Sequence, residues 1–560
     1  MRSGLASRLC ALVIPLVGFG ALTALADNAP TTPTNGSPNT ATADPPIAVP
    51  DTTPCVVPLF AGVTFADFSP KPFSFSPSCG ASSWSKIVLA ADFSVTAGRQ
   101  FDRTASIWIG GANVYFGTTA EPSRTVSPSW HIENDVTELG ALFTQDQAGL
   151  VQLDNLVNDT FTGVLSGRAE LRFYPASRHA APATIADVVI PLSNTATGGA
   201  VGLATTSDRL ARTLSLPRNL ERAYLDIYAQ SQSGDEFWYT CVPDELADTL
   251  QSCGGAGFRE AEVTVDGRPA GVAPIYPWIY TGGIDPSLWR PIPGVQTLDF
   301  APYRVDLSPF AGALADGAPH EIAIHVFGAN NFFATTANLL LYVDHRATHT
   351  GGAITDDTLA EPAPTTTSNI TTGADGSVTG PVRVAAARHY RIAGYVDTSH
   401  GRVRTEVSGD VAFDNTQTFT ITSALYHQLI HQHTSILQRV TRENRGARSD
   451  QITQQAWPLD VDFAFASNAD GTAAQTTQIH QRLERTRTGF DRGFLVDFSV
   501  VDNAVSPTDT LNISAAGAAT GTTGQASHQR YFAADLAGHC YRREITAAAG
   551  VVTAIDDGCD

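Results

Sequence analysis

Asp102 stands inside an otherwise strand-like run of the sequence, residues 98–111. Side chains of an extended chain alternate between two faces, so this acid shares one face with two hydroxyls and an indole, those of Thr104, Ser106 and Trp108. Such a polar face would suit the wall of a cleft that binds a polar, ring-shaped substrate. An ion pair with a neighbouring arginine at the end of a strand would explain the acid as well. The rest of the chain therefore has to decide its role.

Further carboxylates occur in aromatic or apolar company: Glu121, the pair Asp235 and Glu236, and Glu260. Carboxyl groups in different environments can hold different pKa values, so that one acts as a base while another acts as an acid. Each of them alone could equally be a surface residue or part of a salt bridge. Tryptophans occur in or near the same stretches, where they would suit either sugar binding or core packing.

A glycine-rich loop covers residues 280–291. It is not a phosphate loop, because it lacks the closing lysine and serine or threonine, and no helical pattern follows it. We expect a shaped loop at the edge of a β-sandwich that carries Asp285 and Trp289.

Several other chemistries find little support in the sequence. The histidines His427, His431 and His433 resemble a metal cluster, but their spacing fixes no further ligand, and we expect no metal. There is no G-x-S-x-G motif and no catalytic-cysteine signature, which disfavours a serine or cysteine hydrolase. The formal net charge of -20 argues against binding to a nucleic-acid backbone.

The first 26 residues have the pattern of a secretory signal peptide. Arg2 and Arg8 precede an apolar run, and Ala24-Leu25-Ala26 provides a small-residue cleavage site. No later apolar stretch is long enough to cross a bilayer. We expect a protein that is secreted or periplasmic and has no membrane anchor.

Removal of this segment would leave an even number of cysteines in an exported protein, which predicts three disulfides. Pairing of sequence neighbours would close one short loop in each part of the chain, although the sequence allows other connectivities. The cysteine spacing does not fit a zinc site. The cysteines are Cys55, Cys79, Cys241, Cys253, Cys540 and Cys559.

Two stretches rich in threonine, proline and alanine divide the chain. We expect a disordered linker at residues 27–54 and a second linker at residues 348–382. Short β-type segments run between and after them, bounded by glycine, proline, asparagine or aspartate. The sequence therefore predicts an all-β protein: two consecutive jelly-roll or β-sandwich units, at residues 55–190 and 191–347, and a C-terminal β-rich domain at residues 383–560.

Several uncommon motifs occur in the order found in one enzyme family. They are Gly98-Arg-Gln-Phe-Asp-Arg103, Ile107-Trp-Ile-Gly-Gly111, Thr119-Ala-Glu-Pro122, Asp154-Asn-Leu-Val-Asn-Asp-Thr-Phe-Thr-Gly163, Asp235-Glu-Phe-Trp-Tyr239, Phe258-Arg-Glu260 and Tyr280-Thr-Gly-Gly-Ile-Asp-Pro-Ser-Leu-Trp-Arg-Pro291. With them, residues 55–346 resemble the peptide-N4-(N-acetyl-β-glucosaminyl)asparagine amidase A family, the plant-type and acid-active bacterial peptide:N-glycanases. The resemblance is weaker after residue 382.

This resemblance implies hydrolysis of the side-chain amide that joins the innermost GlcNAc of an N-glycan to asparagine, which leaves aspartate and a glycosylamine. It also implies N-glycosylated proteins and glycopeptides as substrates, and activity at acid pH. A fainter resemblance to the flavobacterial peptide:N-glycanase of two jelly rolls puts Asp102 in the place of an essential acid. The supporting acids align less cleanly: Asn155 or Asp154 falls near one, and Glu260 or Glu236 near the other.

From the residues and the resemblance together, we expect Asp102 to activate or orient a water for attack on the amide carbon. Glu260 or Glu236 would then help the sugar-bearing nitrogen to leave. We expect a monomer without metal or cofactor. The alternatives are an endoglycosidase with two carboxylates and a non-catalytic carbohydrate-binding or adhesion protein. The residues expected to contact substrate are Arg103, which we expect to be structural first, Trp108, Glu121, Asn155, Trp238, Asp285 and Trp289.

Overall fold

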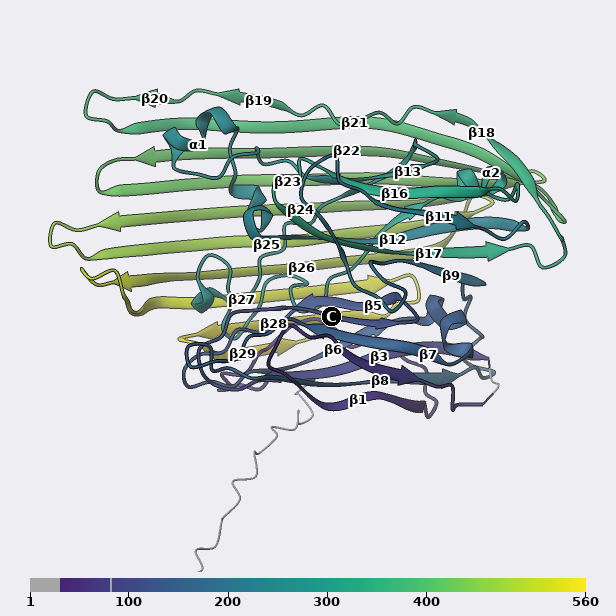
Figure 1. Cartoon of the computed structure of the whole chain (residues 1–560), viewed down its shortest axis with the longest axis horizontal. Coiled ribbons are helices and arrows are strands. Elements are labelled where there is room, and N and C mark those ends of the chain that lie inside the picture. Colours follow the sequence, from purple (N-terminus) through teal and green to yellow (C-terminus); the bar gives the residue numbers. More distant parts are fainter. Residues whose placement is uncertain (1–30, 81–82, 560) are drawn as a thin grey trace, which may run out of the picture.

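The computed structural model describes residues 31–80 and 83–559, which form antiparallel β-sheets with few short helices (Figure 1). Two β-sandwiches follow one another along the chain, and a single large sheet follows them, which confirms the predicted all-β class. The expected signal peptide lies outside the described residues. None of the helices in the described part is long and apolar enough to span a bilayer.

The first sandwich packs two four-stranded sheets around one core. Inward side chains such as Leu89, Ile107 and Leu171 are fully buried there, as expected for strands with one face in a core. A short 3₁₀ helix, η1 (Thr137–Thr144), follows the sixth strand in the chain. In spatial order one sheet consists of β1 (Cys55–Phe65), β8 (Leu165–Pro175), β3 (Trp84–Val95) and β6 (Ser129–Asp135), and the other of β2 (Lys71–Phe75), β7 (Gln147–Leu153), β4 (Thr104–Ile109) and β5 (Ala112–Thr118).

The second sandwich is built in the same way and contacts the first directly. The Asn113 backbone N–H of β5 donates to Oδ1 of Asn338 at 3.2 Å, and Nδ2 of Asn338 donates to the Asn113 carbonyl at 2.8 Å. One sheet has the order β10 (Val201–Leu203), β17 (Phe332–Val343), β12 (Leu220–Gln232) and β15 (Tyr303–Asp306), with β9 (Val188–Leu192) also paired to β17; the other has the order β11 (Leu210–Ser215), β16 (Pro319–Phe327), β13 (Glu260–Val265) and β14 (Arg268–Pro274). Its loops carry η2 (Ser233–Asp235), η3 (Trp238–Thr240), α1 (Asp244–Leu250), η4 (Pro286–Trp289), η5 (Ser308–Phe310) and α2 (Ala311–Leu314).

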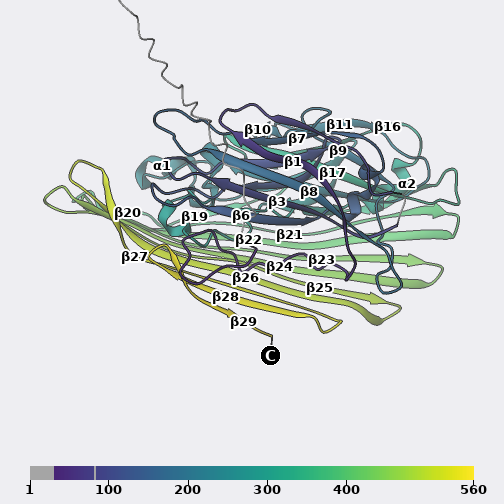
Figure 2. The same ribbon diagram turned by 90° about the horizontal axis from the view of Figure 1, so that it is seen from below.

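The C-terminal part is one 12-stranded antiparallel sheet, and Figure 2 shows both sandwiches lying on one face of it. Its long strands alternate between buried and exposed residues, so the buried set faces the sandwiches. The spatial order is β18 (Gly351–Asp357), β21 (Val378–Thr398), β22 (Gly401–Ile421), β23 (Leu425–Asn444), β24 (Ala447–Ser467), β25 (Ala473–Asp491), β26 (Phe494–Ile513), β27 (Ala519–Asp535), β28 (Cys540–Ala548) and β29 (Val551–Asp557), while β19 (Thr365–Ser368) and β20 (Thr371–Thr372) also pair with β21.

Buried amide side chains on this sheet hold backbone groups of the second sandwich. Gln417 Nε2 donates to the Cys241 carbonyl at 2.9 Å. Gln481 Nε2 donates to the Pro277 carbonyl at 2.7 Å, and its Oε1 accepts from the Val295 N–H at 2.9 Å. Buried polar groups need such partners, so the sheet and the loops complete each other. The buried amides are Asn415, Gln417, Gln428, Gln432, Gln481, Asn503 and Gln529.

Residues 31–54 differ from the expected disordered linker. This segment is extended and contacts both the C-terminal sheet and the first sandwich. The Ala43 N–H donates to Oε1 of Gln529 at 2.7 Å, and the Ile47 N–H donates to Oε2 of Glu133 at 3.0 Å. Its composition predicted disorder because it holds few large apolar residues. Its backbone is nevertheless fixed by partners that lie far away in the sequence.

Residues 348–382 also differ from the expected linker. They contain β18, β19, β20 and the first residues of β21, so the large sheet begins before residue 383. Threonine is common both in linkers and in strands with an exposed face, which is why composition did not separate the two.

The six cysteines expected to pair form three disulfides between sequence neighbours, which confirms the predicted number. They are Cys55–Cys79, Cys241–Cys253 and Cys540–Cys559. Each closes a loop within one part of the fold, and the second encloses α1.

Candidate active site

Three carboxyl groups from separate segments meet where the two sandwiches join. Asp102 lies in the loop two residues before β4, Glu121 lies three residues after β5, and Glu236 directly follows η2 of the second sandwich. The negative charge of Asp102 acts on both glutamates, so it is the common neighbour of the cluster. Asp102 therefore does not lie within a strand, as the alternating pattern predicted, but at the point where the chain enters the sheet.

Gly282, in the glycine-rich loop, lies against two of these carboxyl groups. A Cβ added to Gly282 would lie 2.3 Å from Oδ1 of Asp102 and 2.5 Å from Oε2 of Glu121. Both oxygens thus lie within 2.5 Å of one point, and they are at most about 5 Å apart. Glycine is the residue that permits this approach, because it has no side chain to place there.

The three carboxyl groups have separated pKa values. Burial raises the pKa of Asp102 to about 6, against opposing backbone hydrogen bonds and the charge of Arg103. Burial, followed by the charge of Asp102, raises the pKa of Glu121 to about 8, against the charges of Arg290 and Arg103. Burial and the same aspartate raise the pKa of Glu236 to about 7. As the pH rises, Asp102 therefore loses its proton before either glutamate does.

Two arginines flank the cluster. Arg290 Nη2 lies 3.4 Å from Oε1 of Glu121 and donates to the Pro122 carbonyl at 2.7 Å. Arg103 Nη2 donates to Oε1 of Gln100 at 2.8 Å. Oε2 of Glu121 and Nε of Arg103 are buried and have no hydrogen-bond partner in the described structure. Such atoms are available to groups of a bound substrate.

The C-terminal sheet contacts the loop 280–291 at Ser287. The Ser287 hydroxyl contacts Oδ1 of Asp285 at 2.6 Å and also contacts Oδ2 of Asp509 in β26. Burial raises the pKa of Asp509 to about 6, against the hydrogen bond from Ser287.

Gln525 of β27 extends this support to the arginine at the end of the loop. Its Nε2 donates to the carbonyls of Ser287 and of Arg290, the latter at 3.1 Å. Because the Arg290 side chain contacts Glu121, the large sheet helps to position an acid that belongs to the first sandwich.

Gly282→Ala is expected to lower kcat/KM at least about 100-fold without unfolding the protein, because the new methyl group displaces both carboxyls. The measurement is turnover, at pH 6.5, of the glycopeptide substrate that the sequence resemblance implies, alongside a thermal melt. Gly283→Ala is the matched control, since its Cβ would meet nothing closer than 3.1 Å. Equal activity of the two variants would contradict the proposed packing.

Gln525→Ala is expected to lower kcat about ten- to 100-fold, because the Arg290 end of the loop loses its support. Gln417→Ala is the control, since it removes a buried amide of the same sheet that holds Cys241 instead. Each change should cost about 1 to 3 kcal/mol of stability, because buried or half-buried carbonyls lose a donor. Steady-state kinetics below the melting temperature compare the two variants. An equal fall in kcat for Gln525→Ala and Gln417→Ala would contradict a specific role of Gln525.

The structure does not bring Glu260 into the cluster with Asp102. Glu260 is the first residue of β13, is buried, and forms an ion pair with Arg388 of β21, which also contacts Glu262 at 2.9 Å. The expectation that Glu260 faces the cleft is therefore corrected. Of the two proposed supporting acids, only Glu236 lies beside Asp102.

Three residues expected to contact substrate lie in the protein core instead. Trp108 is 1% exposed, and a Cβ on Gly198 would touch its indole. Trp238 is 0% exposed and packs near Phe413 of the large sheet. Asn155 is 0% exposed, with Nδ2 bonded to backbone carbonyls. Their burial gives no support to the expected contacts with substrate.

Asp285 and Trp289 shape the loop near the cluster. Asp285 accepts from the Ser287 N–H at 2.9 Å and so caps η4, while Trp289 Nε1 donates to the Gly283 carbonyl at 2.9 Å. Both side chains are buried, which makes them supports of the loop rather than groups on its surface.

Sequence reasoning missed two members of the site, Gly282 and Arg290, and assigned Glu121 to substrate binding only. The double glycine at positions 282 and 283 was a signal, since adjacent glycines often mark a close approach of backbone to another group. Arg290 gave no such signal, because its contact with Glu121 spans 169 positions of the sequence.

Two joined β-sandwiches with clustered carboxyl groups of different pKa at their junction suit one class of protein, an all-β hydrolase, because such groups can exchange protons with a substrate. Comparison with known proteins identifies the group more narrowly. A sequence model of the peptide N-acetyl-beta-D-glucosaminyl asparaginase amidase A family matches residues 47–359. The chain belongs to this amidase family, which confirms the resemblance found in the sequence.

The chain is also similar to individual known proteins. The chain is 27% identical over 534 residues to peptide-N4-(N-acetyl-beta-glucosaminyl)asparagine amidase A of Prunus dulcis, an alignment that covers 90% of this chain and 89% of that protein. Among solved structures it is similar to PNGase F, a glycosylasparaginase from Flavobacterium meningosepticum, with a TM-score of 0.35 and 11% identity over 52% of this chain and 96% of that one. PNGF-II has a TM-score of 0.35 and 13% identity over 52% of this chain and 65% of that one.

Proposed function

We propose that this chain hydrolyses the amide bond between the innermost GlcNAc of an N-glycan and asparagine in glycoproteins or glycopeptides, and that Asp102 and Glu121 perform the reaction. Membership of the amidase family supports the reaction. The observation that carries the residue assignment is the close approach of these two carboxyls, at most about 5 Å apart, with pKa values of about 6 and about 8.

Asp102 acts as the general base. Its ionised carboxylate accepts a proton from a water molecule, and the water oxygen forms a bond to the amide carbon of the glycosylated asparagine. The amide C=O electrons move to the carbonyl oxygen and give a tetrahedral intermediate. Glu236, protonated below pH 7, can donate a hydrogen bond to this oxygen as its negative charge develops.

Glu121 acts as the general acid. Arg290 holds one of its oxygens, while the other, Oε2, has no partner among the described residues and is free to donate its proton. Transfer of this proton to the sugar-bearing nitrogen allows the C–N bond to break as the C=O bond re-forms. The products are an aspartate side chain and a glycosylamine, and the proton held by Asp102 returns to Glu121 through solvent.

A two-carboxylate glycosidase is the second candidate, because it would use the same kinds of residue. Inverting glycosidases need carboxyl groups about 6.5 to 9.5 Å apart, and retaining enzymes about 5 to 5.5 Å. The facing oxygens of Asp102 and Glu121 are at most about 5 Å apart, which is nearer to the retaining than to the inverting arrangement. A retaining glycosidase would still have to attack the sugar carbon rather than the amide carbon.

We also propose that the protein is exported. The signal-peptide pattern at residues 1–26 and the three disulfides support a secreted or periplasmic location, where disulfides persist. Glycosylated proteins would be met in that setting. Function as a monomer, without nucleic acid or cofactor, remains part of the proposal.

Digestion of a defined N-glycopeptide, followed by mass spectrometry of the peptide, tests the proposed reaction. We expect aspartate at the former asparagine and release of the whole glycan. A peptide that keeps one GlcNAc on asparagine would identify an endoglycosidase. An unchanged glycopeptide across pH 4 to 8 would favour a binding protein and overturn the proposal.

A further inference from the structure

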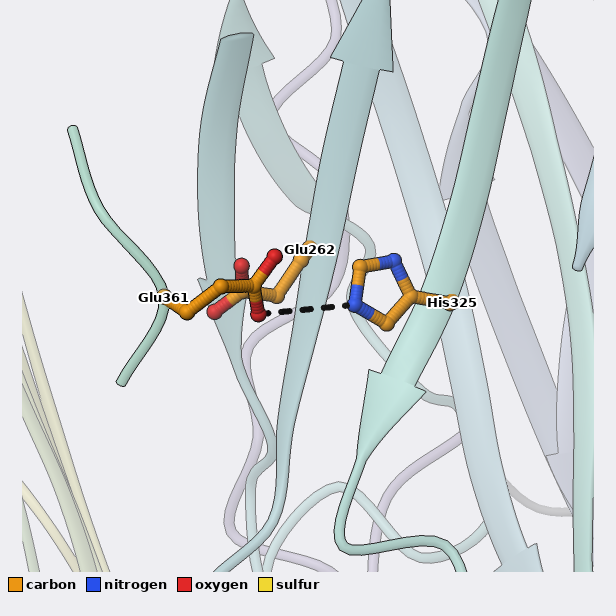
Figure 3. Close-up of side chains that lie close together, drawn as sticks. All are labelled: Glu262, His325 and Glu361. Atoms are coloured by element: carbon orange, nitrogen blue, oxygen red, sulfur yellow. Dashed lines mark ion pairs between the residues drawn. The ribbon is translucent and has the colours of Figure 1, made fainter. Parts of the chain in front are cut away.

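A histidine and two glutamates come together on the second sandwich, outside the carboxyl cluster described above. Glu262 of β13 and His325 of β16 are direct neighbours across the two strands, so their side chains share one face of the sheet. Glu361, from the connection between β18 and β19, lies over them. Figure 3 shows the two carboxyl groups close together, with a ring nitrogen of the histidine directed at them.

The distances suit a small divalent cation. One ligand atom from each residue lies within 4.8 Å of the others, and Nε2 of His325 is 3.9 Å from Oε2 of Glu361. In a tetrahedral zinc site, bonds of about 2.0 to 2.2 Å hold the ligand atoms about 3.3 to 3.6 Å apart. Glu361 is 64% exposed at its side chain and is free to close the remaining gap of up to about 1.5 Å.

The histidine provides evidence independent of the acidic charge. His325 is only 8% exposed, and neither of its ring nitrogens makes a hydrogen bond within the described residues; its one polar contact is the long one to Glu361. A buried imidazole normally has such a partner. Neutral imidazole is also a common ligand of transition metals.

The carboxyl groups around the site also outnumber the guanidinium groups, which favours a cation. Arg388 contacts Oε1 of Glu262 at 2.9 Å and also pairs with Glu260, and the charge of Arg209 acts on His325. With Glu361, three carboxyl groups therefore face two guanidinium groups. Glu262 and Glu361 also interact with each other through their carboxyl groups, a contact that a bound cation would replace. Arg388 Nη1 also donates to the Ala360 carbonyl at 2.6 Å, which holds the Glu361 segment beside the sheet.

We propose that Glu262, His325 and Glu361 form a binding site for a divalent transition-metal ion, with Zn²⁺ the best match to one imidazole and two carboxylates. Three protein ligands leave positions for water. The bound ion would fasten the connection between β18 and β19 to the second sandwich. The site shares no residue with the carboxyl cluster, so its test does not depend on glycan hydrolysis.

The test is equilibrium dialysis of the tag-free full chain against ZnCl₂ at pH 7.5, after treatment with EDTA, with bound zinc measured by mass spectrometry. We expect one high-affinity equivalent per chain, and a rise in melting temperature on adding zinc. Glu361→Gln should weaken binding at least about tenfold and remove the thermal shift. His325→Gln should do the same, but Glu361→Gln remains decisive if the buried change prevents folding.

His345→Gln is the matched control, because His345 also pairs with an acid, Asp187 at 2.9 Å, but is highly exposed and lies outside the cluster. Zinc binding should be unchanged in this variant. The proposal is overturned if the parent chain, without substitutions, binds no zinc at zinc concentrations up to about 100-fold above that of the protein. It is also overturned if Glu361→Gln binds zinc as tightly as the parent chain.

Discussion

Asp102→Asn is expected to lower kcat for glycopeptide hydrolysis at least about 100-fold, because the variant cannot accept a proton from the attacking water. This loss corresponds to about 2.7 kcal/mol of transition-state stabilisation. Steady-state kinetics at pH 6.5, where the aspartate is ionised in the parent chain, provide the measurement. Activity above about a tenth of the parent value, a loss of less than about 1.4 kcal/mol, would remove Asp102 from the role of base.

The Asp102→Asn variant should fold normally. Its stability at different pH values shows whether the loss of activity comes from catalysis or from a change in folding. The pKa of Asp102 is raised from 3.8 to about 6 in the folded state. Ionisation of this group therefore destabilises the fold increasingly between pH 3.8 and about 6, fully above that range, and not at all well below it. Asparagine carries no charge, so the variant should be at least as stable as the parent at pH 8. Asp154→Asn is the control, since Asp154 also lies near Arg103 but outside the cluster.

Glu121→Gln is expected to lower kcat by a similar factor, about 100-fold or more, because glutamine keeps the shape but has no acidic proton to give to the departing nitrogen. Glu260→Gln is the informative comparison. The structure puts that glutamate beside Arg388 rather than Asp102, so its loss should affect stability and leave kcat of the folded protein nearly unchanged. The reverse outcome, with Glu260 required and Glu121 dispensable, would contradict the site.

The pH profile of kcat/KM tests the same assignment of protons in the parent chain. Activity should rise as Asp102 loses its proton near pH 6 and fall between about pH 7 and 8, as Glu236 and then Glu121 lose theirs. Glu236→Gln keeps a neutral hydrogen-bond donor. This variant should therefore retain most activity and shift the falling limb toward pH 8. A falling limb that stays unchanged would argue against Glu236 as a donor.

Features set by neighbouring residues could be predicted from the sequence. Alternating apolar residues between turn residues predicted the strands of both sandwiches, because burial on one face imposes a period of two. Asp102 stood out because an acid there needed a partner or a task. The number of disulfides followed from an even cysteine count in an exported chain.

Features set by distant partners could not be predicted in this way. Glu121 follows β5 and Glu260 begins β13, and only the way the sandwiches pack determines which of them meets Asp102. Trp108 was expected in a cleft because its face of β4 is polar, but that face is covered near Gly198 of the following unit. Likewise, the extended segment at residues 31–54 is held by Gln529, whose position depends on the whole C-terminal sheet.

The large sheet acquires a role through these distant contacts. Its amides hold the loops of the second sandwich, and Gln525 reaches the residue that contacts Glu121. The C-terminal part, for which the sequence offered no function, is thereby connected to the candidate site as a support. Catalytic groups positioned by rigid elements lose less entropy when substrate binds, which gives such a support a direct effect on kcat.

The most direct test of the account is digestion of an N-glycopeptide in water labelled with heavy oxygen. If Asp102 directs water to the amide carbon, the peptide product carries aspartate with one heavy oxygen atom in its side chain, and the released sugar initially carries none. The Asp102→Asn variant should give neither product at a comparable rate. A peptide that retains an unlabelled asparagine, with the heavy oxygen on the sugar, would show attack at the sugar carbon and contradict the proposed glycoamidase mechanism.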